Sequence, residues 1–474
     1  MTRSGVVERL LRSGPGRAGL AAFALLTAAA LYVVVTFPLD FGSARWSNPA
    51  VWADHPRSVP PAWTNLLPGP RRPVHRVLEL DAPTAVAAAG PAELRRYVFH
   101  FTHDTAEPPT LLAFTLGTVT YASRPPQYAL ELHRPDGSSV PLAREAVAGP
   151  RPGESEPYLR HAETPRRLLL SAETRVAEAL ERVFLETYGV ALEPAQLRAR
   201  PLEGLFGAPE ADGRLTPLQG AYRLEARFTV ADPADEVAWT RLVVGGAVYG
   251  ISGTDALGRD LSQGLAFGLP IALLIGLLAS TASTLIGTAL GLVSGFVGGR
   301  TDLVIQRLAD VIANVPVLPL LIFLVFLLGS RLWLILLVLV AFSWPGLTIL
   351  VRSMVLPLRA SPEVEAARVL GASTAHVLWR HVFPHTAPFV LAQLIFFAPG
   401  AILAEAGLSF LGLGDPSLPT WGQILEHGFR TGAVFLGYWW WVLPPGLCLV
   451  VTALSFMLLA LGLETVVNPR LERR

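Results

Sequence analysis

Lysine is absent from this 474-residue sequence, so all 38 of its basic residues are arginine. A phosphate-binding loop of the form G-x-x-x-x-G-K-[ST] needs its lysine to reach the nucleotide phosphates, so the chain is not a P-loop ATPase. The single cysteine, Cys448, excludes an intrachain disulfide. The nucleophile motif G-x-S-x-G and the zinc motif H-E-x-x-H are also missing. We therefore expect no catalytic residue, no metal site and no cofactor.

Charged residues are scarce as well, at 16% of the sequence against 51% hydrophobic residues. The mean hydropathy of +0.45 is too high for a single soluble core and is typical of a polytopic membrane protein with an attached polar part. The formal net charge of +1 indicates no nucleic-acid partner. We expect the lipid bilayer to surround much of the chain.

Six runs carry no charge and are long enough to cross about 30 Å of hydrocarbon as helices. They span residues 18–39, 265–299, 311–330, 332–351, 386–404 and 431–463. Pro316 and Pro319 in the third run, and Pro345 in the fourth, are expected to bend or open their helices, which neighbouring helices tolerate. The sequence thus predicts an α-helical polytopic membrane protein with six transmembrane helices.

Arginine placement predicts the orientation of these helices, because cytoplasmic segments tend to be positive. With the tail 1–17 inside, thirteen arginines fall in cytoplasmic segments and only Arg331 and Arg430 in short outer links. Both tails, 1–17 and 465–474, are then cytoplasmic, and the protein is a multi-pass protein of the cell membrane. We predict a retained anchor helix at 18–39; a cleaved signal peptide is the alternative, although its apolar core is usually shorter.

A segment of domain size separates the first run from the second, and the orientation places it outside the cell membrane. Residues 38–264 hold 27 of the 37 acidic residues and 23 of the 38 arginines. Strand-like stretches occur at 97–103, 110–123 and 220–232, a hairpin with a PDGS turn at 128–144, and one helical stretch at 171–188. We predict a large β-rich α+β extracytoplasmic domain at 40–250, inserted before the helical membrane domain at 265–464.

A polar segment interrupts the apolar half of the chain and reads SPEVEAARVLGASTAHVLWRHVFPH over residues 361–385. Ser361 is a candidate N-cap, and Gly371 suits the left-handed turn that ends a helix. Ser373 is a candidate cap for a second short helix, which Pro384 is expected to stop. Helix-end chemistry alone therefore predicts a helix, a sharp turn and a helix on the cytoplasmic face. Without further information, a plain solvated connector remains the alternative.

Three motifs in order resemble one family. The E-A-A, three residues, G, then proline pattern at 365–384 closely resembles the EAA loop of importer-type ABC permeases. GTDALGRD at 253–260, ILAEAGLSFLGLG at 402–414 and TWG at 420–422 resemble signatures of the C-type permease subunit of dipeptide, oligopeptide and nickel importers. This resemblance covers roughly residues 250–470 and the first helix, and it implies the type I importer permease fold.

The resemblance implies that residues 353–385 form a cytoplasmic coupling loop, which seats in a groove on an ATPase subunit. The motif residues are Glu365, Ala366, Ala367, Gly371 and Pro384. The sequence departs from the family pattern at Phe383, where leucine is more usual, and at His385, where asparagine is more usual. These two changes bear on the fit to the groove.

Other polar residues have structural alternatives beside their functional ones. Glu405 ends the fifth run, and an ionisable group there is a candidate for the translocation pathway, although it is also placed to be hydrated. His100 and His103 stand three apart on a predicted strand and so face opposite sides, which disfavours a metal site. Asp260 and Arg259 in GTDALGRD are expected to serve as a helix cap and in a local ion pair.

The resemblance implies that the chain is half of the translocation pathway of an ATP-driven importer for peptides or similar solutes, without enzymatic activity of its own. Its expected partners are a homologous second permease, two cytoplasmic ATPase subunits and an extracytoplasmic solute-binding protein. The alternative is a membrane-anchored extracytoplasmic sensor or enzyme domain that no longer transports. The inserted domain is expected to help dock the binding protein.

Overall fold

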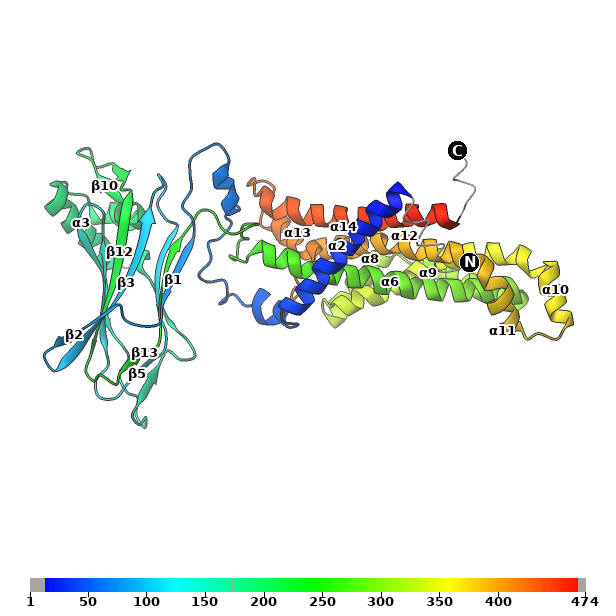
Figure 1. Cartoon of the computed structure of the whole chain (residues 1–474), viewed down its shortest axis with the longest axis horizontal. Helices are drawn as coiled ribbons and strands as arrows, with labels where there is room; N and C mark the ends of the chain where they lie inside the picture. Colours follow the sequence, from blue (N-terminus) through cyan, green and yellow to red (C-terminus); the bar gives the residue numbers. More distant parts are fainter. Residues whose placement is uncertain (1–12, 173, 468–474) are drawn as a thin grey trace. The chain divides into compact units, whose positions relative to one another are not determined.

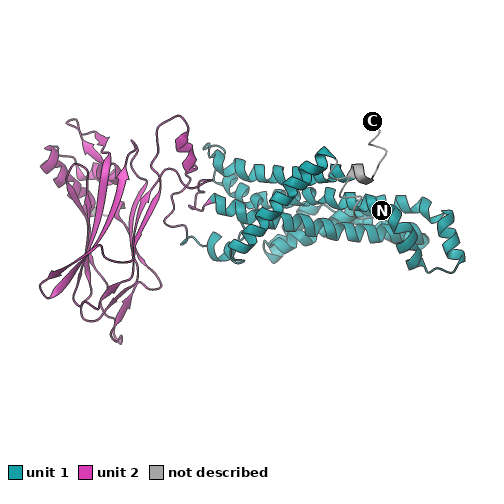
Figure 2. Ribbon diagram, viewed as in Figure 1, with its two compact units in different colours: residues 1–51, 261–474 teal, residues 52–260 magenta. Residues whose placement is uncertain are grey.

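The computed structural model describes residues 13–172 and 174–467. The chain divides into two compact units (Figures 1 and 2). Unit 1 contains the chain up to residue 51 and from residue 261 onward, and unit 2 contains residues 52–260. The predicted tails at 1–17 and 465–474 lie largely outside the described residues.

Unit 2 is built from two main antiparallel sheets (Figure 1). One has the order β2-β3-β12-β6-β7 and the other β1-β14-β4-β9, beside the smaller sheets β13-β5-β8 and β10-β11. The strands are β1 Arg76–Leu80, β2 Ala85–Ala89, β3 Ala92–His103, β4 Leu111–Leu116, β5 Val119–Tyr121, β6 Gln127–His133, β7 Ser139–Ala146, β8 Tyr158–Arg160, β9 Arg166–Leu169, β10 Gly207–Pro209, β11 Leu215–Pro217, β12 Gly220–Val230, β13 Glu236–Val237 and β14 Thr240–Gly245.

The core of unit 2 lies between these sheets, because alternate residues of the strands face inward. In β3 the buried residues are Tyr97, Phe99 and Phe101, and the ring of Phe99 lies 6.3 Å from that of Phe114 on β4. Helix α3 (Thr174–Tyr188) adds Phe184 to the same cluster. Two short helices follow, α4 Pro194–Ala199 and α5 Pro201–Leu205. The predicted β-rich domain, its hairpin and its main helix are confirmed.

Unit 1 is helical, and five of its helices are long and apolar enough to cross a membrane among the described residues. Its helices are α2 Gly14–Thr36, α6 Leu261–Val297, α7 Gly299–Asn314, α8 Val317–Leu328, α9 Leu332–Arg359, α10 Pro362–Val369, α11 Thr374–Val377, α12 Phe383–Phe410, α13 Trp421–Arg430 and α14 Trp439–Val467. Figure 1 shows α10 and α11 at one end of this unit and α13 at the other.

The predicted crossing at 311–330 is not a single helix. Helices α7 and α8 meet at an angle of 77°. The break falls at Val315, which is extended, because a residue before proline avoids the helical conformation. At about 1.5 Å per residue the 12-residue α8 is roughly 18 Å long, too short to span alone. By contrast, α9 continues through Pro345 and Pro357 without interruption.

Small residues allow α6 and α9 to pack at close range. A Cβ atom added to Gly287 would lie 2.9 Å from the Trp344 carbonyl oxygen, and one on Gly291 2.7 Å from Val351. The four-residue spacing places these glycines on one face, as in other close helix pairs in membranes. The Thr348 hydroxyl, itself buried, donates a hydrogen bond to the Gly287 carbonyl across this contact, at 3.2 Å.

Pro384 does not stop the second loop helix, contrary to our expectation. The chain runs from α11 through a π-helical turn, Leu378–Val382, directly into α12. Pro384 lies in the first turn of α12, where a missing N–H costs little. We attribute the continuity to the wider π turn, which accommodates a residue that an α-helical interior would reject.

Candidate functional site

The polar loop between α9 and α12 is a compact helix–turn–helix. At the end of α10 the N–H of Gly371 donates to the Arg368 carbonyl and the N–H of Ala372 to the Ala367 carbonyl, both at 3.0 Å. This pair of bonds is the Schellman arrangement, and Gly371 has the positive φ of 80° that it requires. Ser373 caps α11 as predicted. Ser361 precedes α10, but its side chain makes no capping hydrogen bond.

One face of α10 anchors the loop in the helical unit. Val364 and Ala367 are buried in an apolar cluster that also contains Phe296 of α6 and Val355 of α9. The guanidinium of Arg368 lies over the Phe296 ring, 4.7 Å from its centroid. Because this cluster joins three helices, α10 cannot tilt freely without disturbing the ends of α6 and α9.

A charged network lies beside this cluster and ties α9 to α7 and α6. Arg352 donates two hydrogen bonds of 2.6 Å to the Asp302 carboxylate, one to each oxygen. The Ser294 hydroxyl of α6 donates to the same carboxylate at 2.5 Å, and the Gln306 amide donates to Ser294 at 3.0 Å. Bidentate arginine–carboxylate pairs are among the strongest and most directional in proteins.

The two positions that depart from the family pattern make contacts within the loop. His385 Nε2 lies 3.6 Å from the Glu363 carboxylate, to which His381 Nδ1 donates a hydrogen bond of 2.8 Å. This bond from His381 holds the pKa of Glu363 below its ordinary value. Phe383 stacks in parallel on Trp379, with ring centroids 4.8 Å apart. His385 thus connects the start of α12 to α10, and Phe383 extends the apolar surface of the loop beside Trp379.

The outer surface of the loop exposes large apolar side chains. Val369, Leu370 and Trp379 are 82%, 86% and 70% exposed; the first two precede Gly371, and Trp379 lies in the π-helical turn. Of the residues predicted for coupling, Ala367 is buried, while Glu365, Ala366, Gly371 and Pro384 are exposed. Sequence reasoning missed the three large residues because the family motif does not include them. The presence of large apolar residues next to a polar turn could have indicated this exposed surface.

A cavity of about 310 Å³ lies between α6, α9 and α12. Its walls are made of small side chains and three hydroxyl groups, with two larger apolar side chains. The lining residues are Ala279, Ser280, Ser283, Leu339, Ser343, Phe397, Gly400, Ala401 and Ala404. Hydroxyl groups in an otherwise apolar helical unit offer hydrogen bonds to a polar solute or to water.

Glu405 follows Ala404 in sequence but is absent from the lining of this cavity. It is 3% exposed, and the Ser409 hydroxyl donates a hydrogen bond of 2.6 Å to its carboxylate. The nearby N-terminus of α13 packs tightly on α12, since a Cβ on Gly422 would lie 2.5 Å from the Ala406 carbonyl oxygen. A pathway role for Glu405 remains a prediction.

The TWG and GTDALGRD motifs make structural contacts. In TWG, Thr420 caps α13, and the buried Trp421 indole donates a 3.0 Å hydrogen bond to the Leu265 carbonyl of α6. In GTDALGRD, the predicted ion pair forms: Arg259 Nε donates to the Asp255 carboxylate at 2.5 Å, with both side chains buried. These contacts account for the motifs without a ligand.

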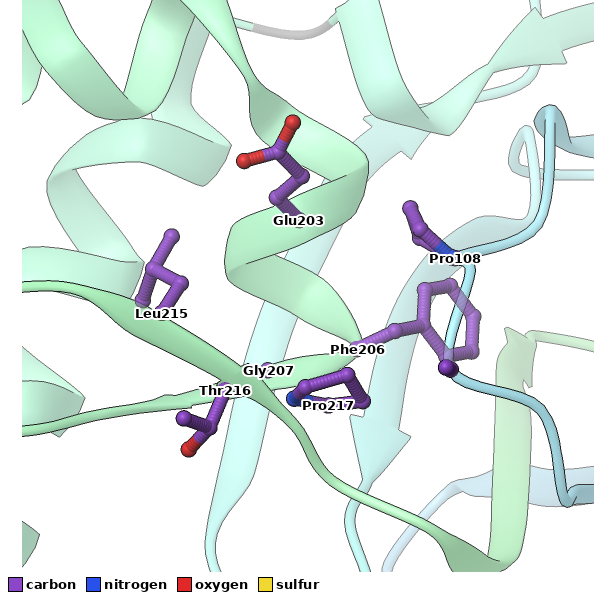
Figure 3. Close-up of a pocket in the computed structure, with 8 residues that line it drawn as sticks. Pro108, Glu203, Phe206, Gly207, Leu215, Thr216 and Pro217 are labelled. Atoms are coloured by element: carbon purple, nitrogen blue, oxygen red, sulfur yellow. The ribbon is translucent and has the colours of Figure 1, made fainter. Parts of the chain in front are cut away.

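Unit 2 offers no metal site among its described residues, since no cluster of three potential ligands occurs there. His103 is buried and His100 is exposed, as the strand alternation predicts. A cavity of about 140 Å³ near α5 is mostly apolar, and Figure 3 shows Leu215 and Phe206 on opposite sides of it. Its one carboxylate, on Glu203, lies 3.4 Å from Arg200.

Comparison with known families finds a similarity in the membrane part. Residues 287–473 match the family described as binding-protein-dependent transport system inner membrane component. This segment contains the polar loop, the cavity helices α9 and α12, and the C-terminal end of α6 from residue 287 to Val297. The resemblance inferred from the sequence motifs is confirmed.

Individual relatives align over a similar share of the chain's length. A probable peptide ABC transporter permease protein of Sinorhizobium fredii is 39% identical over 176 residues, 36% of this chain and 59% of the relative. The dipeptide transport system permease protein DppC of Bacillus subtilis is 34% identical over 177 residues, 37% of this chain and 55% of the relative. The oligopeptide transport system permease protein OppC of the same organism is 34% identical over 179 residues, which are 37% of this chain and 57% of the relative. The chain thus spans little more than half the length of these relatives.

Proposed function

Because its membrane unit resembles the permease subunits of peptide ABC importers over residues 287–473, we propose that this chain is one permease subunit of an ATP-driven importer. It contributes half of a translocation pathway in the cell membrane and performs no chemistry itself. A homologous permease supplies the other half, two ATPase subunits bind on the cytoplasmic side, and a solute-binding protein delivers the cargo. The cargo class that the names of the relatives favour is peptides.

The observation that carries this proposal is the apolar surface on the tip of the polar loop. Val369, Leu370 and Trp379 are largely exposed, although Val364 and Ala367 on the opposite face of α10 are buried. An exposed apolar patch on a rigid support is typical of a docking site. Full burial of each such side chain contributes about 1.5–3 kcal/mol, and here an ATPase subunit would provide that burial.

The cavity between α6, α9 and α12 is the part of the pathway that this chain supplies under the proposal. Its serine hydroxyls suit the polar backbone of a peptide, and its small residues leave room for passage. Glu405 remains a secondary pathway candidate. The proposed coupling loop contains Glu365, Ala366, Ala367, Gly371 and Pro384. Its helices α10 and α11 lie at the end of unit 1 opposite α13 (Figure 1), and the proposal places this end on the cytoplasmic side.

Unit 2 lies between α2 and α6 in the sequence, where the proposed orientation makes it extracytoplasmic. Under the proposal it helps to bind the solute-binding protein. Deleting residues 60–245 while keeping α2 and α6 tests this role. Weaker binding of the solute-binding protein to the deleted permease is expected. Unchanged affinity would remove a docking role for unit 2 but would leave the transport role of unit 1 intact.

The central test replaces the loop tip. We expect the Leu370→Ser and Trp379→Ser double variant to lose co-purification with the ATPase subunits and to lose ATP-driven peptide uptake in proteoliposomes. The matched control is Phe435→Ser, which removes an equally exposed apolar residue from the link between α13 and α14. If the double variant still binds the ATPase subunits as tightly as the control does, the docking proposal is wrong. The alternative of a membrane-anchored sensor gains nothing from the family match, which falls on the membrane part.

A further inference from the structure

A second cavity in unit 2, of about 210 Å³, lies beside an irregularity in the five-stranded sheet. The pairing of β6 with β7 shifts register between Leu130 and Glu131, so that a β-bulge interrupts the ladder. Both of these residues line the cavity, as do Pro141, Leu142 and Ala143 on the bulged strand. Bulges commonly re-aim side chains next to binding sites.

Four arginines from three elements line this cavity: Arg144 of β7, Arg175 and Arg182 of α3, and Arg227 of β12. The only carboxylate in the lining is that of Glu131, which forms an ion pair with Arg227. Within the described part of the chain, no carboxylate lies within ion-pair distance of the other three arginines. The lining therefore contains three solvent-exposed arginines without a carboxylate partner among the described residues.

The helix contributes its two arginines in a regular way. Arg175, Ala179 and Arg182 are spaced i, i+4 and i+7, which puts them on one stripe of α3. The small side chain of Ala179 leaves room between the two guanidinium groups, and all three residues line the cavity. The neighbouring stripe, with Val176, Leu180 and Phe184, is buried in the core and fixes the orientation of the helix.

We propose that this cavity binds a small oxyanion, either a carboxylate-bearing solute or phosphate. Guanidinium groups match the planar, two-oxygen geometry of a carboxylate and bind phosphate oxygens equally well. Such a ligand offsets the mutual repulsion of Arg144, Arg175 and Arg182. The apolar floor, formed by Ala129, Leu130 and Leu142, accommodates a short hydrocarbon portion. The site goes beyond the transport role and does not depend on it.

Titration calorimetry on the purified full-length chain in detergent tests the proposal, with inorganic phosphate and glutarate as separate probes. We expect at least one probe to bind the unchanged protein. Its affinity for the double variant Arg175→Gln/Arg182→Gln is expected to be lower by about tenfold or more, since each charge-assisted hydrogen bond is strong. Raising the salt from low ionic strength to about 0.5 M is expected to weaken binding further. Tighter binding of glutarate identifies a carboxylate ligand, and tighter binding of phosphate identifies a phosphate ligand.

The matched control is Arg198→Gln/Arg223→Gln, which removes the same charge from exposed positions of unit 2 outside the cavity. The single variant Arg144→Gln, on a different element, is expected to weaken binding as well. The proposal is overturned if neither probe binds at about 10 mM, a concentration far above the range of specific small-ligand sites. It is equally overturned if the α3 variant binds as the control does.

Discussion

Gly371 is a residue at which the backbone of the polar loop, proposed above as the coupling loop, can be perturbed without contact to another side chain. Its φ is +80°, and a Cβ atom added there would meet no atom within 4 Å. Replacement by valine therefore acts mainly through the backbone, where a non-glycine residue in the left-handed region costs about 1–2 kcal/mol. That energy corresponds to a roughly 5- to 30-fold fall in the population of the observed turn.

We expect ATP-driven peptide uptake by Gly371→Val to fall by a similar factor in proteoliposomes that contain all partner subunits. Gly371→Asn separates two causes, because asparagine tolerates the left-handed conformation. If only the backbone matters, the asparagine variant transports well; if an ATPase surface approaches the turn closely, it fails too. Gly432 is the matched control, with φ +76° in the same kind of turn after α13 and free space around it. Normal uptake by Gly371→Val, or an equal loss in Gly432→Val, would refute the reasoning.

Three further perturbations follow from the described contacts. Arg352→Met removes one partner of the bidentate pair and is expected to lower the free energy of unfolding by about 1–3 kcal/mol. In the double variant Arg352→Met/Asp302→Asn, part of this lost stability should return, as measured by thermal unfolding. Burial holds the pKa of His75 at about 4. Since the unfolded state then binds more protons between pH 6.5 and 4, the free energy of unfolding should fall by about 2 kcal/mol from pH 7.5 to 5. His75→Phe should remove this dependence, as measured by denaturant titrations at the two pH values. Filling the cavity with Ser283→Trp should reduce uptake strongly, whereas Leu285→Trp on the exposed side of α6 should not; equal uptake in both would exclude the cavity from the pathway.

The apolar helices and the strands were predictable because each depends on neighbouring residues in sequence. Charge-free runs of about 20 residues predict membrane helices from composition alone, and five such helices formed. The alternation of buried aromatic residues in β3 predicts a half-buried strand in the same way. Gly371 and Ser373 were predictable for a related reason, since caps and left-handed turns are local chemistry.

The features that sequence reasoning missed are those that join distant parts of the chain. Arg352 and Asp302 are 50 residues apart, and no local pattern predicts their pairing. A bend near Pro316 was expected, but the size of the bend between α7 and α8, 77°, was not predicted by any local pattern. Amphipathic α13 was missed because its residues are too polar for a crossing and were assigned to a link. The exposure of Leu370 also depends on which face of α10 is buried, which only the packing decides.

The loop and the membrane helices are connected in a way that constrains how the proposed coupling operates. Val364 of α10 shares one packed cluster with Phe296 of α6 and Val355 of α9, and packed clusters shift between discrete arrangements rather than deforming gradually. The Arg352–Asp302 pair fixes α7 to the same assembly. A push on the exposed tip therefore moves the adjoining ends of α6, α7 and α9 together. Relative motion must then be absorbed elsewhere, and the extended residue Val315 between α7 and α8 is a break in the helical backbone outside this assembly.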